Sequence, residues 1–249
     1  MTRSSDQRQR LDTLIASVRE HPTADLYRAA WGDAGTFEEL PSISRRDIVA
    51  TPLARRHYAS DIGMVKVVRD PSGSFLSPWS FADIARESFG AISKRPMVYL
   101  SDPHEAIEKS MWCYERGMLP VIGEKDAQMA MFAAGKYEID SLIADPVSLL
   151  SFEPFLVSRT LASITVISDT FEIGALSRFG AYASEVRLVL ALPETGAIAV
   201  ATLAQHSRFS LVRDCIIERD EHIVVTKLAP LLMPIIKYDT RISSEVLRA

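Results

Sequence analysis

One carboxylate stands in a tight turn between two apolar runs. Glu194 lies between the runs 188–192 and 197–199, in the turn Pro193-Glu194-Thr195-Gly196. Both runs are typical of strands, so we expect the turn to direct Glu194 out of a sheet edge. A carboxylate suits Mg²⁺, because this small, hard ion prefers oxygen ligands and is usually shared between carboxylates and phosphates. The alternative is that Glu194 is only a polar residue of a hairpin turn.

A second candidate lies in the segment between residues 57 and 82. This segment contains Asp70-Pro71-Ser72-Gly73-Ser74, which has turn chemistry and little regular pattern, and we expect a loop there. Ser72, Gly73 and Ser74 are the first place to look for a phosphate site, because backbone N–H groups and hydroxyls can surround phosphate oxygens. The apolar pair Phe75-Leu76 that follows cannot replace such donors. A plain Pro-Ser-Gly turn is the alternative.

Asp169 is a third candidate. It follows an apolar run that ends at Ile167, and ligands bind at the carboxyl ends of strands in open α/β sheets. The alternative role of Asp169 is to cap the next helix.

Other common catalytic patterns are missing from the sequence. The five histidines are far apart and form no His-x-x-x-His pair, and no nucleophile elbow, Walker loop or dinucleotide fingerprint occurs. Cys113 lies beside Trp112 inside an amphipathic pattern, which favours packing over a nucleophile. The two cysteines have no Cys or His companions at metal spacing, so we expect neither a disulfide framework nor structural zinc.

Composition indicates an ordinary soluble globular protein. The 249 residues are 47% hydrophobic and 24% charged, enough for a substantial core. The formal net charge of -4, with scattered basic residues, makes nucleic acid an unexpected partner. The polar start of the chain and the lack of a long apolar run predict neither a signal peptide nor a membrane span, so we expect a cytoplasmic protein.

The pattern of elements predicts an α/β fold with a mostly parallel sheet. Helices are expected at 11–18 and 24–31, and a short one follows Ser44. Strands are expected at 97–100, 118–122, 141–144, 161–168 and 186–192, with helices at 103–116, 126–134, after Asp145-Pro146 and at 172–182. Strands near 197–202, 209–217 and 222–227 then form a C-terminal β-meander. We expect a helical N-terminal region, residues 1–96, and an α/β core, residues 97–249.

Two segments, in this order, carry a resemblance to a known family. Leu190-Ala191-Leu192-Pro193-Glu194-Thr195-Gly196 is followed forty residues later by Leu232 to Arg241. Together they resemble the end of the large domain of adenylate-forming enzymes, most closely the phenylacetate-CoA ligase-like members. Such enzymes join a carboxylic acid to AMP and pass the acyl group to a thiol, usually that of coenzyme A.

The resemblance assigns roles to several residues. Glu194 matches the magnesium glutamate of the family motif Tyr-Gly-x-Ser/Thr-Glu-x-Gly, and Thr195 follows it in the motif. Ser72, Gly73 and Ser74 fall at the phosphate loop, Asp169 falls at the adenine segment, and Tyr238 begins the final motif. Asp239 is a substitute ribose ligand if the strand register differs.

The chain departs from the family pattern at four elements of the nucleotide site. Leu190, Ala191 and Pro193 replace the tyrosine, first glycine and hydroxyl of the magnesium motif, and the phosphate loop lacks its lysine. Only the position of Asp169 matches the adenine segment. Ile242 stands where the family has its ribose-binding aspartate. The chain ends at Ala249, and we expect no counterpart of the small C-terminal domain with its lysine.

Two functions follow from this pattern. The first is a shortened, non-adenylating protein that binds an acyl or aryl carboxylate-derived molecule or serves a biosynthetic pathway as an accessory subunit, without a cofactor. The second is an active enzyme that uses ATP and Mg²⁺ to transfer an acyl group to CoA or a carrier thiol without the usual lid domain. The implied partners are CoA, a carrier protein, a ligase subunit or a second copy of the chain.

Overall fold

The computed structural model describes residues 4–56, 64–68, 74–80, 83–84, 93–123, 125–170, 173–205, 209–212, 214–219, 221–229 and 231–247. The chain divides into two compact units. Unit 1 comprises Met1–Asp83, Pro193–Thr195 and Arg213–Ser244. Unit 2 comprises Ile84–Leu192, Gly196–Val212 and Glu245–Ala249. These units differ from the contiguous segments 1–96 and 97–249, because the C-terminal strands group with the N-terminal helices.

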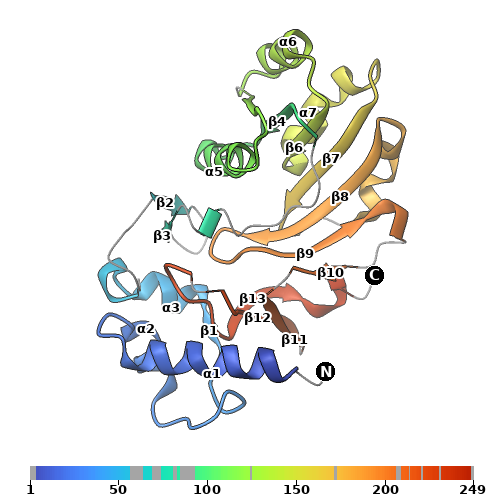
Figure 1. Ribbon diagram of the computed structural model, residues 1–249. Coiled ribbons are helices and arrows are strands. Elements are labelled where there is room, and N and C mark those ends of the chain that lie inside the picture. Colours follow the sequence, from blue (N-terminus) through green and yellow to red (C-terminus); the bar gives the residue numbers. More distant parts are fainter. Residues whose placement is uncertain are drawn as a thin grey trace. The chain divides into compact units, whose positions relative to one another are not determined.

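A sheet of seven strands among the described residues forms the centre of unit 2 (Figure 1). Its order is β10 (Ser210–Leu211), β9 (Gly196–Thr202), β8 (Ala183–Leu192), β7 (Leu161–Ser168), β6 (Ser141–Ala144), β4 (Pro96–Tyr99) and β5 (Val121–Ile122). The pairs from β5 to β8 are parallel, whereas β9 and β10 are antiparallel. The predicted α/β class with a mostly parallel sheet is confirmed.

Helices connect the parallel strands, and aspartates begin three of them. Asp102, Asp126 and Asp145 accept hydrogen bonds from the free N–H groups of α5 (Pro103–Tyr114), α6 (Ala127–Tyr137) and α7 (Pro146–Leu156). Proline is the first residue of α5 and α7, where its lack of an N–H group costs no hydrogen bond. The residue types therefore fix where α5, α6 and α7 start.

Some predicted element bounds are wrong. Helix α6 continues through Gly135 to Tyr137, and the next residue, Glu138, closes the helix in the left-handed conformation with a φ of 53°. The predicted helix at 172–182 is a 3-10 helix, η2 (Ile173–Ala181), and the predicted strand at 118–122 is reduced to β5. Glycine inside a helix is destabilising but tolerated, which is why Gly135 was a poor stop signal.

One face of the sheet packs against helices to form the core of unit 2. Leu142 and Ile164 of the sheet pack with Phe152 of α7 and with Leu176 and Phe179 of η2. Burial of such side chains is the main favourable contribution to folding.

Unit 1 combines helices, a four-stranded sheet and a hairpin among its described residues. The helices are α1 (Ser5–Glu20), α2 (Asp25–Trp31), α3 (Arg45–Ala50) and the 3-10 turn η1 (Leu53–Arg55). The sheet order is β1 (Ile43–Ser44), β13 (Tyr238–Ser243), β12 (His222–Lys227) and β11 (Cys215–Arg219), and only β1 and β13 run parallel. The short 3-10 turn η3 (Leu203–Gln205) belongs to unit 2, and the turn η4 (Ser244–Leu247) begins at the last residue of unit 1.

Two features of the chain differ from the prediction. The segment expected to be a loop between 57 and 82 contains the antiparallel hairpin β2 (Met64–Val68) and β3 (Phe75–Trp79). The single strand expected at 209–217 is two strands in different sheets, β10 and β11, because Asp214 with φ of 68° turns the chain between them.

Across the described ranges, no helix is both long and apolar enough to span a bilayer.

Candidate functional site

The β8–β9 connection forms the tight turn that the sequence predicts. Leu192 pairs with Gly196, whose φ of 64° suits a residue without a Cβ atom. The turn residues 193–195 belong to unit 1, although the strands on either side belong to unit 2. Ser77 of β3 donates a hydrogen bond to the carbonyl oxygen of Pro193 over 3.4 Å. The β8–β9 turn is therefore hydrogen-bonded to another residue of unit 1.

The side chain of Glu194 is fully buried in unit 1. Its Oε1 atom accepts hydrogen bonds from Nε of Arg45 and from the hydroxyl of Tyr238, the second over 2.6 Å. The side chain of Glu194 is 0% exposed and that of Arg45 is 23% exposed. The three residues come from the β8–β9 turn, the first position of α3 and the first position of β13, and we call them the Glu194 cluster.

The electrostatics of the Glu194 cluster raise the pKa of both Arg45 and Tyr238. Burial opposes the charge of Arg45, but its hydrogen bond and ion pair with Glu194 outweigh burial and raise the pKa of the guanidinium. Burial, followed by the charge and hydrogen bond of Glu194, raises the pKa of Tyr238 well above its usual value. Tyr238 is therefore a permanent donor, and Arg45 a permanent cation, at neutral pH.

The described residues do not fit a magnesium ion at Glu194. The guanidinium of Arg45 already neutralises the carboxylate at Oε1, and a second cation beside it would be repelled in this buried setting. No group of three His, Cys, Asp or Glu residues in the described ranges is placed to hold a metal ion. The other oxygen, Oε2, is buried and has no hydrogen-bond partner among the described residues.

The structure brings together some of the predicted site residues. Thr195 is buried beside Glu194 in the turn, and Tyr238 contacts Glu194 directly. Ser74 is exposed just before β3, whereas Ser72 and Gly73 lie outside the described residues. Ser74 therefore has no described contact with the Glu194 cluster.

Two predicted residues have other partners or another location. Asp239 follows Tyr238 in β13, and neighbouring residues of a strand point to opposite faces. Its carboxylate lies 3.4 Å from Nδ1 of His222 and 3.2 Å from Nε of Arg241. Asp169 lies in unit 2, at the carboxyl end of β7, and is half-buried.

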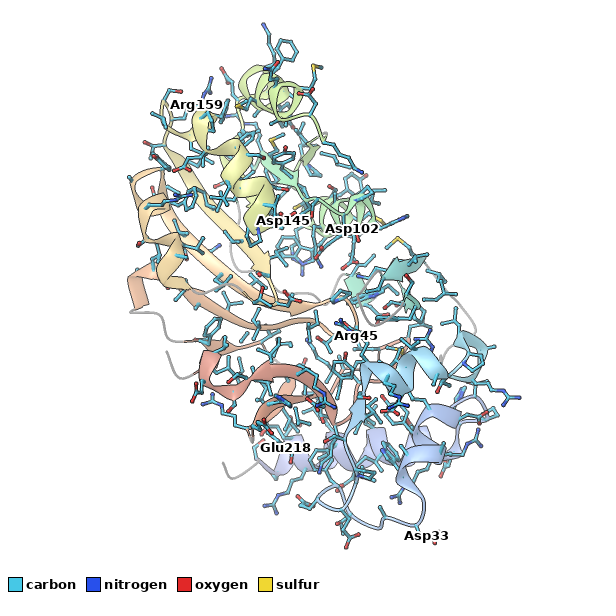
Figure 2. The ribbon with its side chains drawn as sticks, turned by 180° about the vertical axis from the view of Figure 1, so that it is seen from behind. Asp33, Arg45, Asp102, Asp145, Arg159 and Glu218 are labelled. Atoms are coloured by element: carbon cyan, nitrogen blue, oxygen red, sulfur yellow. The ribbon has the colours of Figure 1, made fainter. Side chains whose placement is uncertain are left out.

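Sequence reasoning missed two arginines of unit 1 that lie near the Phe75 ring. The sequence pattern places Arg45 only in a short helix and assigns no role to Arg56. Their guanidinium carbons lie 6.0 Å and 5.9 Å from the centroid of the Phe75 ring. Figure 2 labels Arg45 among the side chains of unit 1. The only available signal was basic character at the two ends of the segment 45–56.

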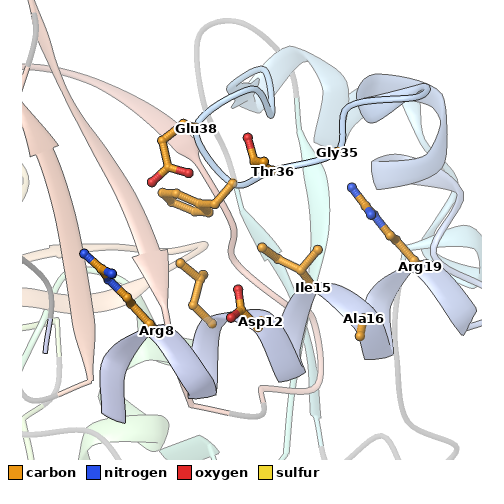
Figure 3. A pocket seen from close by; sticks show the side chains of 10 residues that line it. Arg8, Asp12, Ile15, Ala16, Arg19, Gly35, Thr36 and Glu38 are labelled. Atoms are coloured by element: carbon orange, nitrogen blue, oxygen red, sulfur yellow. The ribbon is translucent and has the colours of Figure 1, made fainter. Parts of the chain in front are cut away.

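A groove of about 700 Å³ lies elsewhere in unit 1 (Figure 3). One wall is α1, with Arg8, Asp12 and Arg19, and the other is the loop 35–38. Its lining contains charges of both signs and none of the predicted site residues. The residues that line the groove therefore include no member of the Glu194 cluster.

Comparisons with known proteins give matches of structure only. No protein-family model matches the chain, and no curated protein matches it. The amide bond synthetase McbA from Marinactinospora thermotolerans is 16% identical with a TM-score of 0.53, over 73% of this chain and 43% of that chain. O-succinylbenzoate coenzyme A synthetase (MenE) from Bacillus subtilis, solved in complex with AMP, is 10% identical with a TM-score of 0.54, over 70% and 42%.

A third structure, VinN in complex with L-aspartate, is 10% identical with a TM-score of 0.53, over 70% of this chain and 51% of that chain. The chain thus spans about half the length of the solved structures it matches. At these identities the likeness concerns the fold. The chain has the fold of adenylate-forming enzymes.

Proposed function

We propose that this protein is a non-adenylating relative of the phenylacetate-CoA ligase-like enzymes. In this proposal it binds an acyl or aryl carboxylate-derived small molecule and serves a biosynthetic pathway as a binding or accessory protein. The observation that carries the proposal is the closed Glu194 cluster, in which the glutamate at the family's magnesium position is buried and paired with Arg45.

The pairing supports this function for an electrostatic reason. A glutamate that holds Mg²⁺ must present negative charge to the ion and to phosphate oxygens around it. Here Arg45 neutralises that charge, and Tyr238 occupies the same carboxylate oxygen. Pro193 also stands where the family has a hydroxyl, so the turn lacks a side-chain donor for phosphate at this position.

One atom favours the second function, an active carboxylate-activating enzyme. Oε2 of Glu194 has no hydrogen-bond partner among the described residues, and buried carboxylate oxygens are seldom left unpaired. If this oxygen becomes a metal ligand once ATP is present, the chain still adenylates. The two functions therefore differ in one measurable property, the binding of MgATP through Glu194.

Calorimetric titration with ATP and Mg²⁺ tests the proposal. We expect no saturable heat from MgATP or AMP, and no pyrophosphate release in the presence of acyl or aryl acids. Wild-type protein is compared with Glu194→Gln, and Glu138→Gln serves as the control, because Glu138 is exposed and forms an ion pair with Arg95. Saturable MgATP binding that is lost in Glu194→Gln and kept in Glu138→Gln would overturn the proposal in favour of the enzyme.

The accessory role is supported by apolar side chains on the surface of unit 2. Tyr114, Leu119 and Phe132 are 69%, 62% and 59% exposed, and such side chains are frequent at protein interfaces. The partners that we propose are a second copy of this chain, a carrier protein or a ligase subunit. Light scattering of the purified chain, followed by mixing with a purified carrier protein, separates self-association from binding of another protein.

A further inference from the structure

Arg56 is a buried cation with no carboxylate partner among the described residues. It follows η1 in unit 1 and is only 4% exposed. Its Nε atom has no hydrogen-bond partner in the described part of the chain, and Nη1 lies 3.9 Å from the sulfur of Met233. A thioether is a weak acceptor, so this contact does little to offset the burial of a full positive charge.

Arg45 and Arg56 provide a direct comparison. Both guanidinium groups lie about equally far from the Phe75 ring, at 6.0 Å and 5.9 Å from its centroid. Arg45 has the carboxylate of Glu194, which raises its pKa despite burial. For Arg56 burial lowers the pKa, and no carboxylate in the described ranges counteracts this effect. Both guanidinium groups thus lie near the Phe75 ring, but of the two only Arg45 has a counter-ion in the part of the chain that the structure describes.

An uncompensated buried charge is among the least favourable features of a folded protein. A cation–π contact at this distance contributes little compared with the loss of hydration. Arginine presents a rigid fork of donors that matches the two oxygens of a carboxylate. The missing counter-ion is therefore of the kind that a bound oxyanion would supply.

We infer that Arg56 binds the carboxylate of the small-molecule ligand, as part of the ligand-binding function proposed above. Phe75 and Met233, which lie beside the guanidinium group, are 5% and 4% exposed, so the surroundings of Arg56 are apolar. Such surroundings favour a singly charged acyl or aryl carboxylate over a phosphate, which carries more charge and loses more hydration on burial. Arg56 is thus a candidate specificity residue outside the family's nucleotide motifs.

Thermal unfolding and calorimetry with defined probes test this inference. The carboxylate probes are phenylacetate, benzoate and octanoate. Inorganic phosphate and AMP are the phosphate probes, and sodium chloride at matched ionic strength is the control for salt effects. The variants are Arg56→Met and Arg56→Lys. Arg55→Met is the matched control, because Arg55 is the neighbour of Arg56 in the sequence and its side chain is 69% exposed.

We expect at least one carboxylate to stabilise the wild type and Arg55→Met. In Arg56→Met this stabilisation should disappear, while the unfolding temperature without ligand equals or exceeds that of the wild type, because an unpaired buried charge has been removed. Arg56→Lys keeps the charge and loses the fork, so we expect about 10- to 100-fold weaker binding, and this variant carries the test if Arg56→Met does not fold.

The opposing results separate the two proposals. Carboxylate binding that survives unchanged in Arg56→Met and Arg56→Lys would refute the role of Arg56 and leave the ligand-binding function standing. Stabilisation by phosphate and AMP alone would refute the carboxylate assignment. No stabilisation of the wild type by any probe would refute both the ligand-binding function and the role of Arg56.

Discussion

The hydroxyl of Tyr238 donates a hydrogen bond to Oε1 of Glu194 over 2.6 Å, although 44 residues separate them in the sequence. Arg45 reaches the same oxygen from a position 149 residues away. These contacts join the β8–β9 turn to the first residues of β13 and α3. The Glu194 cluster is therefore a long-range connection inside unit 1, and its removal has predictable effects.

Glu194→Gln should destabilise the protein by about 2–4 kcal/mol, because it leaves Arg45 without its counter-ion. This expected loss of stability is smaller than the loss for a fully buried ion pair, since the side chain of Arg45 is 23% exposed. Urea denaturation measures the change. Glu138→Gln, which breaks an exposed ion pair with Arg95, should change stability by less than about 1 kcal/mol. Equal effects of the two substitutions would contradict the structural role of the Glu194 cluster.

Tyr238→Phe should change how stability depends on pH at alkaline values. Burial, together with Glu194, raises the pKa of Tyr238 above its ordinary value of 10.0. The phenol therefore ionises in the unfolded chain near pH 10 while it stays protonated in the folded chain, so stability falls as pH rises above that value. The fall should be shallower in Tyr238→Phe, as measured by urea denaturation at several pH values from 8 to 11. Identical slopes in both proteins would show that Tyr238 is not the titrating group.

Both cysteines should resist alkylation in the folded protein. Burial raises the pKa of Cys113 to about 12, and it also raises the pKa of Cys215. Because the thiolate is the reactive form, iodoacetamide at neutral pH should modify neither residue until denaturant is added. Mass spectrometry of peptides gives the extent of modification. Rapid labelling of Cys113 in the native protein would mean that α5 opens readily.

Gly123→Ala should destabilise unit 2 by about 1–3 kcal/mol, as typical for overpacking. A Cβ atom at this position would lie 2.5 Å from Cδ2 of Tyr99 and 2.9 Å from Cε of Met97. Gly174 is the control, because a Cβ atom there meets nothing within 4 Å, and Gly174→Ala should stay within about 0.5 kcal/mol of the wild type. Thermal unfolding distinguishes the two variants, and similar midpoints would show that Tyr99 can move aside.

The sequence by itself determined the elements with strong local signals. Strands β6 and β7 lie at the residues predicted, because continuous apolar runs bounded by turn residues leave little ambiguity. Helices α5 and α7 begin where Asp102 and Asp145 predict, since an aspartate cap followed by proline satisfies the first turn locally. The parallel sheet follows from the alternation of these elements.

Only the tertiary structure decided which distant residues meet. No local pattern indicates that Arg45 pairs with Glu194, or that Arg56 has no carboxylate partner among the described residues. Both features depend on how separate segments pack in unit 1. The hairpin β2–β3 was also missed, because the turn signal at 70–74 dominated the short strands around it. Sequence periodicity reports burial along one element, whereas the charge balance of a site depends on groups brought together from several elements by the fold.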